Sequence, residues 1–471
     1  MHDRTLLFLC AVLLMSAATS MARADANAID QRSDHAKWKG TLYDGTPITT
    51  VDISRILEAH ERWFKGEKDG TKANLSGAKL PGVELTKVSL TDAVLFEVDL
   101  SSANLRGTDL RRADLRGATL AHTSLSRASL INANLNKANL VEADLSEAAL
   151  IEANLGEAYL GGADLRGADL RGANLDSAEL FGAKLEGATW AKASMRYAHM
   201  NRADFRTADL SDTNLHEAQL READLRDANL DHSKMNGANL LGAKMSGAIL
   251  SEANVSDVAF DLEPGTLPNI LSMASASGLA DMRYERSPAS LIELREAFRT
   301  AGLRAQASEV HFAIMHTRRL QAGRFEKILL LAVEIPCDYG MRPVRPLLIL
   351  LSAILAFWIP YLFALKKRGT GGIWIIWPDD RTPKDEATEK DARLSPPWFR
   401  RIGVALYFSV VSAFNIGWEE INIGSWIARM QPKEFTLKAT GWVRVVAGVQ
   451  SLLGVYMVAL SILSYFGHLF E

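Results

Sequence analysis

Large apolar residues stand at every fifth position of the chain from Leu75 to Phe260, and most of them are leucine. Two positions before each of them lies a small residue, usually alanine, so size and polarity share one period. The pattern covers residues 71–260, which make 38 units of five residues. A period of five matches neither the 3.6-residue period of an α-helix nor the two-residue alternation of a strand. Self-similarity at a fixed period predicts a solenoid instead.

The units themselves carry a resemblance to a known family. Ala-Asn-Leu-Arg-Gly at residues 103–107 and Ala-Asp-Leu-Arg-Gly at residues 163–167 resemble the units of pentapeptide-repeat proteins, and the resemblance covers residues 71–260. It implies a mainly β fold, a right-handed quadrilateral β-helix in which each unit forms one side of a square coil. A narrow interior accommodates one leucine per side only beside a companion as small as alanine, because protein interiors are close-packed. The other three positions of each unit are expected to face water.

The two ends of this solenoid need protection. With four units per coil, 38 units make 9.5 coils, and coils spaced like neighbouring strands give a rod about 45 Å long. Open coil edges invite pairing with other chains, so solenoids need caps. Within residues 25–70, Asp52–Phe64 has an acidic start and apolar residues at helical spacing, and is expected to form an N-terminal capping helix. Asn269–Ser277, which follows a stretch containing Pro and Gly, is expected to cover the last coil.

One part of the repeat region departs from the leucine pattern. Larger or different apolar residues replace leucine at four successive units: Trp190, Met195, Met200 and Phe205. Tyr159, Tyr197 and His199 occupy outward positions nearby. Two interpretations follow, namely larger core residues in a slightly widened coil, or a binding face formed by the outward residues.

Residues 261–345 are expected to form a helical cap and linker. Pro288–Thr300 and Ala305–Gln321 have apolar residues at helical spacing and predict two amphipathic helices. His311 and His316 are five residues apart and fall on different sides of a helix, so they do not predict a metal site. The sequence contains no pattern that indicates a cofactor.

Long apolar segments follow the linker. Leu347–Leu365 is a run of nineteen residues without a charge, and it predicts a transmembrane helix over residues 346–366. Residues 443–467 predict a second one. The nine Lys and Arg residues of Lys366–Arg401 place the loop of residues 367–401 in the cytoplasm by the positive-inside rule.

A shorter apolar stretch lies between these two helices, in residues 402–424. Ile402–Trp418 has seventeen residues, which makes it marginal as a span. It either crosses the membrane or enters and returns. The re-entrant alternative keeps the Lys and Arg residues of Arg429–Lys438 in the cytoplasm, so the charge distribution favours it.

The start of the chain predicts export. Arg4 precedes an apolar core at Leu6–Met15, and small residues around Ala24 indicate cleavage, so residues 1–24 are expected to be a signal peptide. The alternative is an uncleaved N-terminal anchor, and both alternatives export the repeat region. We therefore expect a multi-pass protein of the inner (cytoplasmic) membrane with its rod in the periplasm. Cys337, the one cysteine outside the signal, is assigned no role.

A second resemblance concerns residues 405–420, which are similar to the pore helix and filter of two-helix potassium channels. Filters of that family present backbone carbonyls to the ion. The candidate pore-like loop consists of Asn415, Ile416, Gly417, Trp418, Glu419 and Glu420. Glu419 stands where the family has a second glycine, whose backbone conformation a glutamate adopts only at a cost, and the loop would enter from the cytoplasm. The resemblance therefore does not imply potassium selectivity.

Composition and motifs narrow the function. A net charge of −3 gives no global field that would attract nucleic acid or anionic lipid. No nucleophile elbow, phosphate loop or dinucleotide fingerprint occurs, so we do not predict an enzyme. We expect a membrane-anchored scaffold or binding protein. Its expected partners are the lipid bilayer and a protein or envelope component on the β-helix surface, and homo-oligomers are left open.

Two alternatives remain. The first is a cation channel or sensor in which the rod is coupled to a pore lined by Glu419 and Glu420. The second is the DNA mimicry by which some pentapeptide-repeat proteins protect topoisomerases. That activity needs the cytoplasm and a strongly acidic rod, whereas residues 71–260 contain 26 acidic and 20 basic residues. We therefore expect no nucleic-acid partner.

Overall fold

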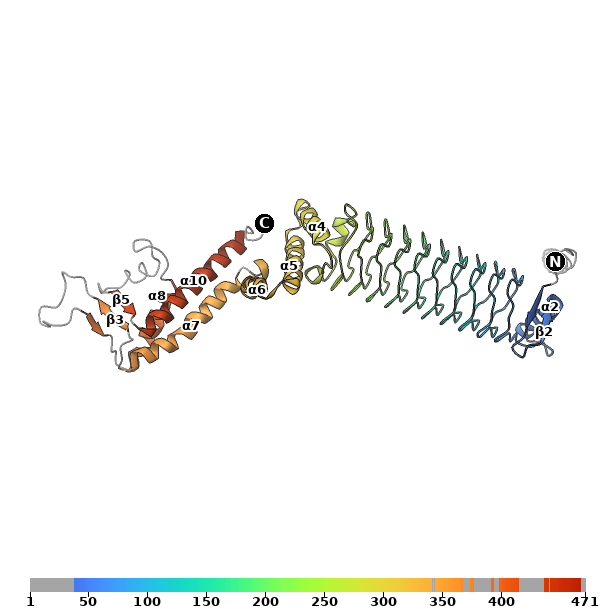
Figure 1. Cartoon of the computed structure of the whole chain (residues 1–471), viewed down its shortest axis with the longest axis horizontal. Helices are drawn as coiled ribbons and strands as arrows, with labels where there is room; N and C mark the ends of the chain where they lie inside the picture. The colour runs from blue at the N-terminus through green and yellow to red at the C-terminus, as the bar shows by residue number, and fades with distance from the viewer. Residues whose placement is uncertain are drawn as a thin grey trace, which may run out of the picture. The chain divides into compact units, whose positions relative to one another are not determined.

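A computed structural model describes most of the chain (Figure 1). The described residues are 38–340, 342, 344–366, 373–376, 391–393, 398–414, 436–439 and 441–466. The chain divides into two compact units, residues 1–277 and residues 278–471. The predicted signal peptide of residues 1–24 and the candidate pore-like loop lie outside the described residues, so both stay predictions.

The repeat region is a β-helix whose coils follow one another in a row (Figure 1), with four units in each coil. Its right hand is the one that pentapeptide repeats imply. Each short bridge is parallel and joins residues twenty positions apart, as in Asn104 with Ser124 and Ser124 with Asp144. The main-chain N–H of Leu105 donates to the Ser124 carbonyl of the next coil at 2.7 Å. That of Asn104 donates to the Val83 carbonyl of the previous coil at 2.9 Å. The predicted solenoid, its period and its four-unit coil are thus confirmed.

The interior contains the residues that the pattern placed there. All 38 large residues from Leu75 to Phe260 are at most 2% exposed, and their small companions are buried with few exceptions, such as half-buried Val88. Trp190 and Phe205 are fully buried and meet edge to face with ring centroids 6.1 Å apart. The inward departures from leucine are therefore larger core residues, as the first interpretation proposed.

Each unit turns a corner two residues after its large residue. In one unit the N–H of Ala138 donates to the Leu135 carbonyl at 2.9 Å, and Lys137 has a left-handed backbone with φ of 60°. Glycine adopts this conformation freely, as Gly162 does, whereas Glu142 adopts it because the surrounding coil imposes it. The corner residue is usually exposed, but the other two outward positions are mostly half-buried, so the expected exposure is confirmed only in part.

The N-terminal cap is larger than predicted. Helix α2 runs over Thr50–Phe64, two residues longer than expected, because the N–H of Thr49 donates to the Asp52 carboxylate at 2.9 Å and begins the helix earlier. A hairpin of β1 (Lys39–Thr41) and β2 (Pro47–Thr49) precedes it and was not predicted. Thr41 pairs antiparallel with Lys79 and so covers the edge of the first coil.

The C-terminal cap closes the last coil, as predicted. Helix α3 (Ile270–Met273) follows Asn269, whose side chain accepts from the N–H of Ser272 at 3.1 Å. The hydroxyl of Ser272 accepts from the N–H of Leu250 at 3.1 Å. Further on, the N–H of Val255 donates to the Ser277 carbonyl at 2.8 Å. Main-chain groups that the missing next coil would have bonded are satisfied in this way.

The second unit begins with helices. The predicted pair is confirmed as α4 (Ala289–Thr300) and α5 (Arg304–Gln321), preceded by the short helix η1 (Leu279–Asp281). Helix α6 (Arg324–Cys337) and the turn η2 (Asp338–Gly340) follow, and the sequence did not separate them from the linker.

Two of the remaining helices are long and apolar enough to cross a membrane. These are α7 (Arg345–Lys366) and α10 (Trp442–Phe466), with candidate spans of 21 and 24 residues, and both match the predicted segments. Between them α8 (Trp398–Ala413) is a shorter helix of 16 residues. A three-stranded antiparallel sheet in the order β4-β3-β5 was not predicted. Its strands are β3 (Ile373–Ile376), β4 (Asp391–Arg393) and β5 (Thr436–Ala439).

We predict that Leu135→Asp prevents the β-helix from folding, because it places an unpaired carboxylate between two coils and costs more than about 4 kcal/mol. Lys137→Ala changes an outward corner residue and should alter stability by about 0.5 kcal/mol or less. Thermal unfolding of the purified full chain, followed by circular dichroism, compares the two variants. Equal unfolding temperatures would contradict the inward assignment of the leucine positions.

Candidate interaction surfaces

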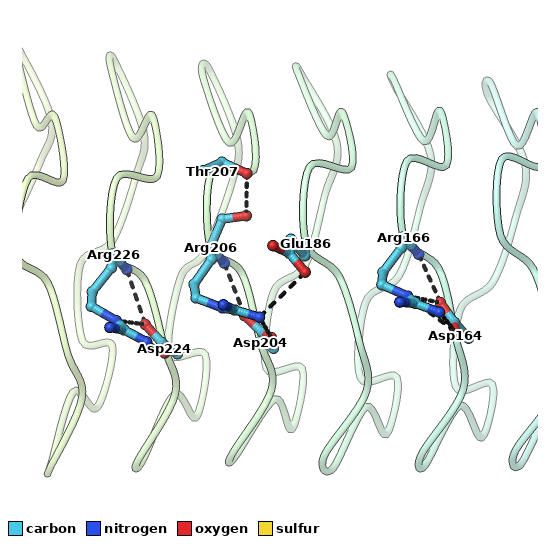
Figure 2. Close-up of polar contacts among 8 residues, drawn as sticks. All are labelled: Asp164, Arg166, Glu186, Asp204, Arg206, Thr207, Asp224 and Arg226. Atoms are coloured by element: carbon cyan, nitrogen blue, oxygen red, sulfur yellow. Dashed lines mark hydrogen bonds and ion pairs between the residues drawn. The ribbon is translucent and has the colours of Figure 1, made fainter.

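Paired charges cover much of the β-helix surface. Asp164 precedes a buried leucine and Arg166 follows it, so both side chains point outward and meet (Figure 2). The guanidinium donates from Nε to Oδ1 at 2.8 Å and from a terminal nitrogen to Oδ2 at 2.5 Å. Such forked contacts are the stronger kind of ion pair. The same Asp-x-Arg arrangement recurs at Asp109–Arg111, Asp114–Arg116, Asp169–Arg171, Asp204–Arg206 and Asp224–Arg226.

A second set of pairs joins successive coils. Residues twenty positions apart lie above one another, so opposite charges at that spacing meet. Examples are Arg112–Asp92, Arg127–Glu147, Lys137–Glu157, Arg202–Glu222 and Arg206–Glu186, the last of which is visible in Figure 2. The acidic side chains in these pairs are partly neutralised by their neighbours and do not add up to one continuous acidic field.

Aromatic side chains gather on another part of the β-helix. Tyr159 and Phe181 are 52% and 53% exposed, and Tyr197 is 44% exposed. The guanidinium of Arg202 lies 5.6 Å from the centroid of the Phe181 ring, and His199 lies 3.3 Å from the Glu179 carboxylate. We call Tyr159, Phe181, Tyr197, His199 and Arg202 the aromatic surface.

Coil register brings the aromatic surface together. Tyr159, Glu179 and His199 are bridged in one column across three coils. Phe181 lies beside this column. Its neighbours in the previous coil are Gly161 and Gly162, and the N–H of Gly162 donates to the Phe181 carbonyl at 3.0 Å. Glycines add no side chain there, which leaves the Phe181 ring open to solvent.

The outward placement predicted for Tyr159, Tyr197 and His199 is confirmed. Phe181 and Arg202 were not predicted from the sequence. Phe181 could have been found, because it directly follows a repeat leucine at a position where most units have a polar or small residue. Larger exposed apolar groups on a soluble surface often mark an interaction site.

A buried polar chain ties the three apolar helices of the second unit together. The hydroxyl of Tyr361 on α7 donates to the side-chain carbonyl of Gln450 on α10 at 2.7 Å. The Gln450 amide donates to the Ser409 carbonyl on α8 at 3.0 Å, and the Ser409 hydroxyl donates to the Ile354 carbonyl on α7 at 2.8 Å. The three side chains are at most 1% exposed. These polar residues were not predicted from the sequence, although a polar side chain within an apolar helix often indicates a contact with another helix.

Two apolar clusters, one on each side of these hydrogen-bonded polar residues, show in which direction the helices run. Near one end Leu365 of α7 packs with Val443 of α10, and near the other Leu350 of α7 packs with Met457 of α10. Helices α7 and α10 are therefore antiparallel. Helix α8 follows α7 in the reverse direction and reaches Leu350 with Ala413, its last residue, so it ends inside the bundle.

Helices α8 and α10 approach closely at one glycine. A Cβ added at Gly454 would lie 2.0 Å from the Ala413 carbonyl oxygen. Small residues at such crossings let helix backbones meet. At Gly448, on the same helix, an added Cβ would meet nothing within 4 Å.

The other candidate residues are separated or outside the described part. His311 lies 3.2 Å from Arg295, whereas His316 lies 3.3 Å from Glu334, so the structure places the two histidines in different surroundings. Among the described residues no group of three or more His, Cys, Asp or Glu side chains could hold a metal ion. Cys337 is a buried free thiol. Asn415–Glu420 begin directly after Phe414, the last described residue in this part of the chain, and their role as a pore-like loop stays a prediction.

Comparison with known families agrees with this geometry. Eight copies of the pentapeptide-repeat model match the chain between residues 71 and 260. The chain belongs to the pentapeptide-repeat family. A search of curated proteins finds no match.

Several solved pentapeptide-repeat structures are similar to the chain. HetL, a pentapeptide-repeat protein involved in heterocyst differentiation regulation from the cyanobacterium Nostoc sp. strain PCC 7120, is 30% identical, with 45% of this chain and 98% of HetL covered and a TM-score of 0.33. Rfr23 from the cyanobacterium Cyanothece 51142 is 26% identical over 31% of this chain and 93% of its own, with a TM-score of 0.19. The plasmid-mediated fluoroquinolone resistance protein QnrB1 is 17% identical over 46% and 99%, with a TM-score of 0.28.

We predict that the pentapeptide-repeat rod loses stability in acid. The hydrogen bond from Arg166 lowers the pKa of Asp164, and that from Arg206 lowers the pKa of Asp204. A carboxyl with a depressed pKa stabilises the fold above its unfolded pKa of about 3.9 and loses this contribution as the pH falls through the folded pKa. The unfolding temperature should therefore fall below about pH 4. In Asp164→Asn/Asp204→Asn this fall should be shallower, and in the control Lys192→Gln unchanged; equal slopes in all three proteins would refute the role of these pairs.

We also predict that Gly454→Ala destabilises the helical bundle by about 2 kcal/mol or more, because the new methyl group pushes α10 away from Ala413. Gly448→Ala should be neutral or stabilising by about 1 kcal/mol, since alanine is the better helix former and has free space there. Thermal unfolding of the detergent-solubilised full chain measures both. If both glycines respond alike, the close approach of α8 and α10 is wrong.

Proposed function

We propose that this pentapeptide-repeat protein is a non-enzymatic, membrane-anchored scaffold. Its β-helix presents the aromatic surface to a protein or envelope component in the periplasm, while α7 and α10 hold the chain in the inner membrane. The observation that carries the proposal is the aromatic surface itself, an exposed group of rings on a β-helix whose other outward side chains include many self-paired charges.

The chemistry of the aromatic surface suits binding of another molecule. Exposed aromatic rings and arginine are the side chains that most often dominate binding energy in interfaces. Tyr159 and Phe181 extend from coils that are hydrogen-bonded on both sides, so little conformational freedom is lost when a partner covers them. Catalysis has no such support, and pentapeptide-repeat proteins are generally non-catalytic scaffold or interaction proteins.

Membrane anchoring is supported by the length and apolar character of α7 and α10. The orientation rests on charge, because nine Lys and Arg residues lie between Lys366 and Arg401 and favour the cytoplasm for that loop. Since α7 and α10 are antiparallel, the chain that joins them begins and ends on this same side. The repeat region, which precedes α7, then lies on the exported side.

A second candidate is a cation channel in which copies of the chain surround a pore. The observation that favours it is the end of α8, which lies beside Leu350 and Ile354 of α7 and therefore within the bundle. A re-entrant segment would begin in this way, with a helix that enters the bundle beside α7 and α10. Conductance in planar bilayers that disappears on replacement of Glu419 and Glu420 would favour the channel over the scaffold.

DNA mimicry receives less support than either. A mimic of the phosphate backbone needs a dense row of unneutralised negative charge. In this β-helix many carboxylates pair with arginine or lysine, within a coil as at Asp224 or between coils as at Glu147. The predicted export also separates the β-helix from cytoplasmic DNA enzymes.

We predict that a photo-crosslinking residue at Tyr159 captures a partner in intact cells, and that one at Ala191, on the opposite side of the β-helix, does not. Phe181→Ser should reduce the Tyr159 adduct about tenfold or more, because it removes a central ring. Phe96→Ser is the matched control, since Phe96 also follows a repeat leucine and lies under an arginine, Arg116. Equal adducts from Tyr159 and Ala191 would contradict the proposed surface.

We predict the topology with a reporter that is active only outside the cytoplasm. Fused after Glu285, it should be active; fused at Thr382, in the loop with many positive charges, it should be inactive. The reverse result would place the β-helix in the cytoplasm and return DNA mimicry to consideration.

A further inference from the structure

Helix α6 exposes a row of large apolar side chains. Phe325 is 76% exposed, Ile328 65%, Leu329 55% and Ile335 58%. Their spacing of three, one and six residues places them on one side of the helix, and we call them the α6 stripe. Four large apolar residues in a row are not a favourable surface for water, so a partner for the stripe has to be identified.

The opposite side of α6 is fixed to the protein. The Glu334 carboxylate accepts hydrogen bonds from Arg319 of α5 at 3.0 Å and from the Tyr339 hydroxyl at 3.2 Å. The side chains of Arg319 and Glu334 are 13% and 15% exposed, and Cys337 is fully buried. On the side of the stripe itself, the Ala332 carbonyl near the C-terminal end of α6 accepts a hydrogen bond from the Tyr456 hydroxyl of α10. These contacts prevent α6 from rotating to bury the stripe against its own unit.

The stripe is followed along the chain by a second apolar surface that suits lipid. Helix α7 begins eight residues after α6 ends, and the Asp338 carboxylate between them accepts from Arg345 at 2.8 Å, which holds the connecting turn. From its start α7 exposes Leu348, Leu351 and Leu355 along one side. The residues that flank the stripe at the N-terminal end of α6 are basic, Arg324 and Lys327. Apolar residues next to basic ones in a helix beside a span are typical of a helix at the membrane surface.

We propose that α6 lies at the boundary between lipid headgroups and acyl chains, with the α6 stripe in the acyl chains and Arg324 and Lys327 at the headgroup phosphates. The inference rests on the proposed anchoring by α7 and α10. It adds a function for the linker, because the Arg319–Glu334 pair then holds α5 against the membrane surface. Helix α5 would be joined to the bilayer through this fixed helix rather than through a free tether.

The test measures the depth of single labels in the full chain. Cys10 and Cys337 are replaced by serine, and one cysteine at a time is introduced by Ile328→Cys in the stripe, Glu326→Cys on the polar side of α6, or Leu355→Cys on α7. Each protein is labelled with an environment-sensitive fluorophore and reconstituted into phosphatidylcholine–phosphatidylglycerol vesicles. Brominated acyl chains report contact with lipid, and aqueous iodide reports contact with water.

Brominated lipid should quench the labels at positions 328 and 355 at least twofold, while iodide should quench the label at position 326. Lipid quenching at 355 together with iodide quenching at 328 would overturn the placement of α6 and leave the anchoring intact. Insensitivity of 328 to both quenchers would also overturn it, since a second copy or another protein would then cover the stripe. Failure of lipid to quench at 355 would overturn the anchoring itself.

A poorly folded background would not prevent the measurement. If the Cys337→Ser chain does not accumulate, Cys337 is retained, because its buried thiol is protected from the reagent. The chain without an introduced cysteine then measures the background labelling.

Discussion

The width of the β-helix interior is the constraint on which the rest of the first unit depends. Each side of a coil encloses one large residue only beside a small companion, so two of every five positions are committed to the core. Main-chain hydrogen bonds to the coils before and after then hold each unit in register at a separation of twenty residues. Because the core depends on the inward pair, the outward residues are free to vary without disturbing the fold.

The register turns sequence positions into columns on the surface. Asn134, Asn154 and Asn174 form such a column, in which the side-chain amides of Asn154 and Asn174 each donate to the asparagine of the previous coil at 3.1 Å. Asp and Arg side chains form others, and the column of Tyr159, Glu179 and His199 supports the aromatic surface. A column aligns side chains that are twenty residues apart in sequence, so a surface feature becomes visible only when successive coils are aligned with one another. This explains why Phe181 and Arg202 were missed although the fold itself was predicted.

The features that the sequence predicted are those with many repeated or cumulative signals. The leucine period, the buried departures at Trp190 and Phe205, the capping helix α2 and the long apolar helices α7 and α10 belong here. Features that depend on a few distant contacts were not predicted. The strand β1 has three residues and owes its place to the pairing of Thr41 with Lys79. Similarly, α6 ends at a left-handed Asp338 that local apolar pattern does not indicate.

The second unit meets a requirement that the first does not. In the β-helix the enclosed side chains are apolar with few exceptions, whereas the α7, α8 and α10 bundle encloses large polar side chains together with apolar ones. Tyr361, Ser409 and Gln450 satisfy one another there, which is the condition for keeping polar groups away from water. Their hydrogen bonds select one arrangement of three helices whose outer surfaces are apolar and little differentiated.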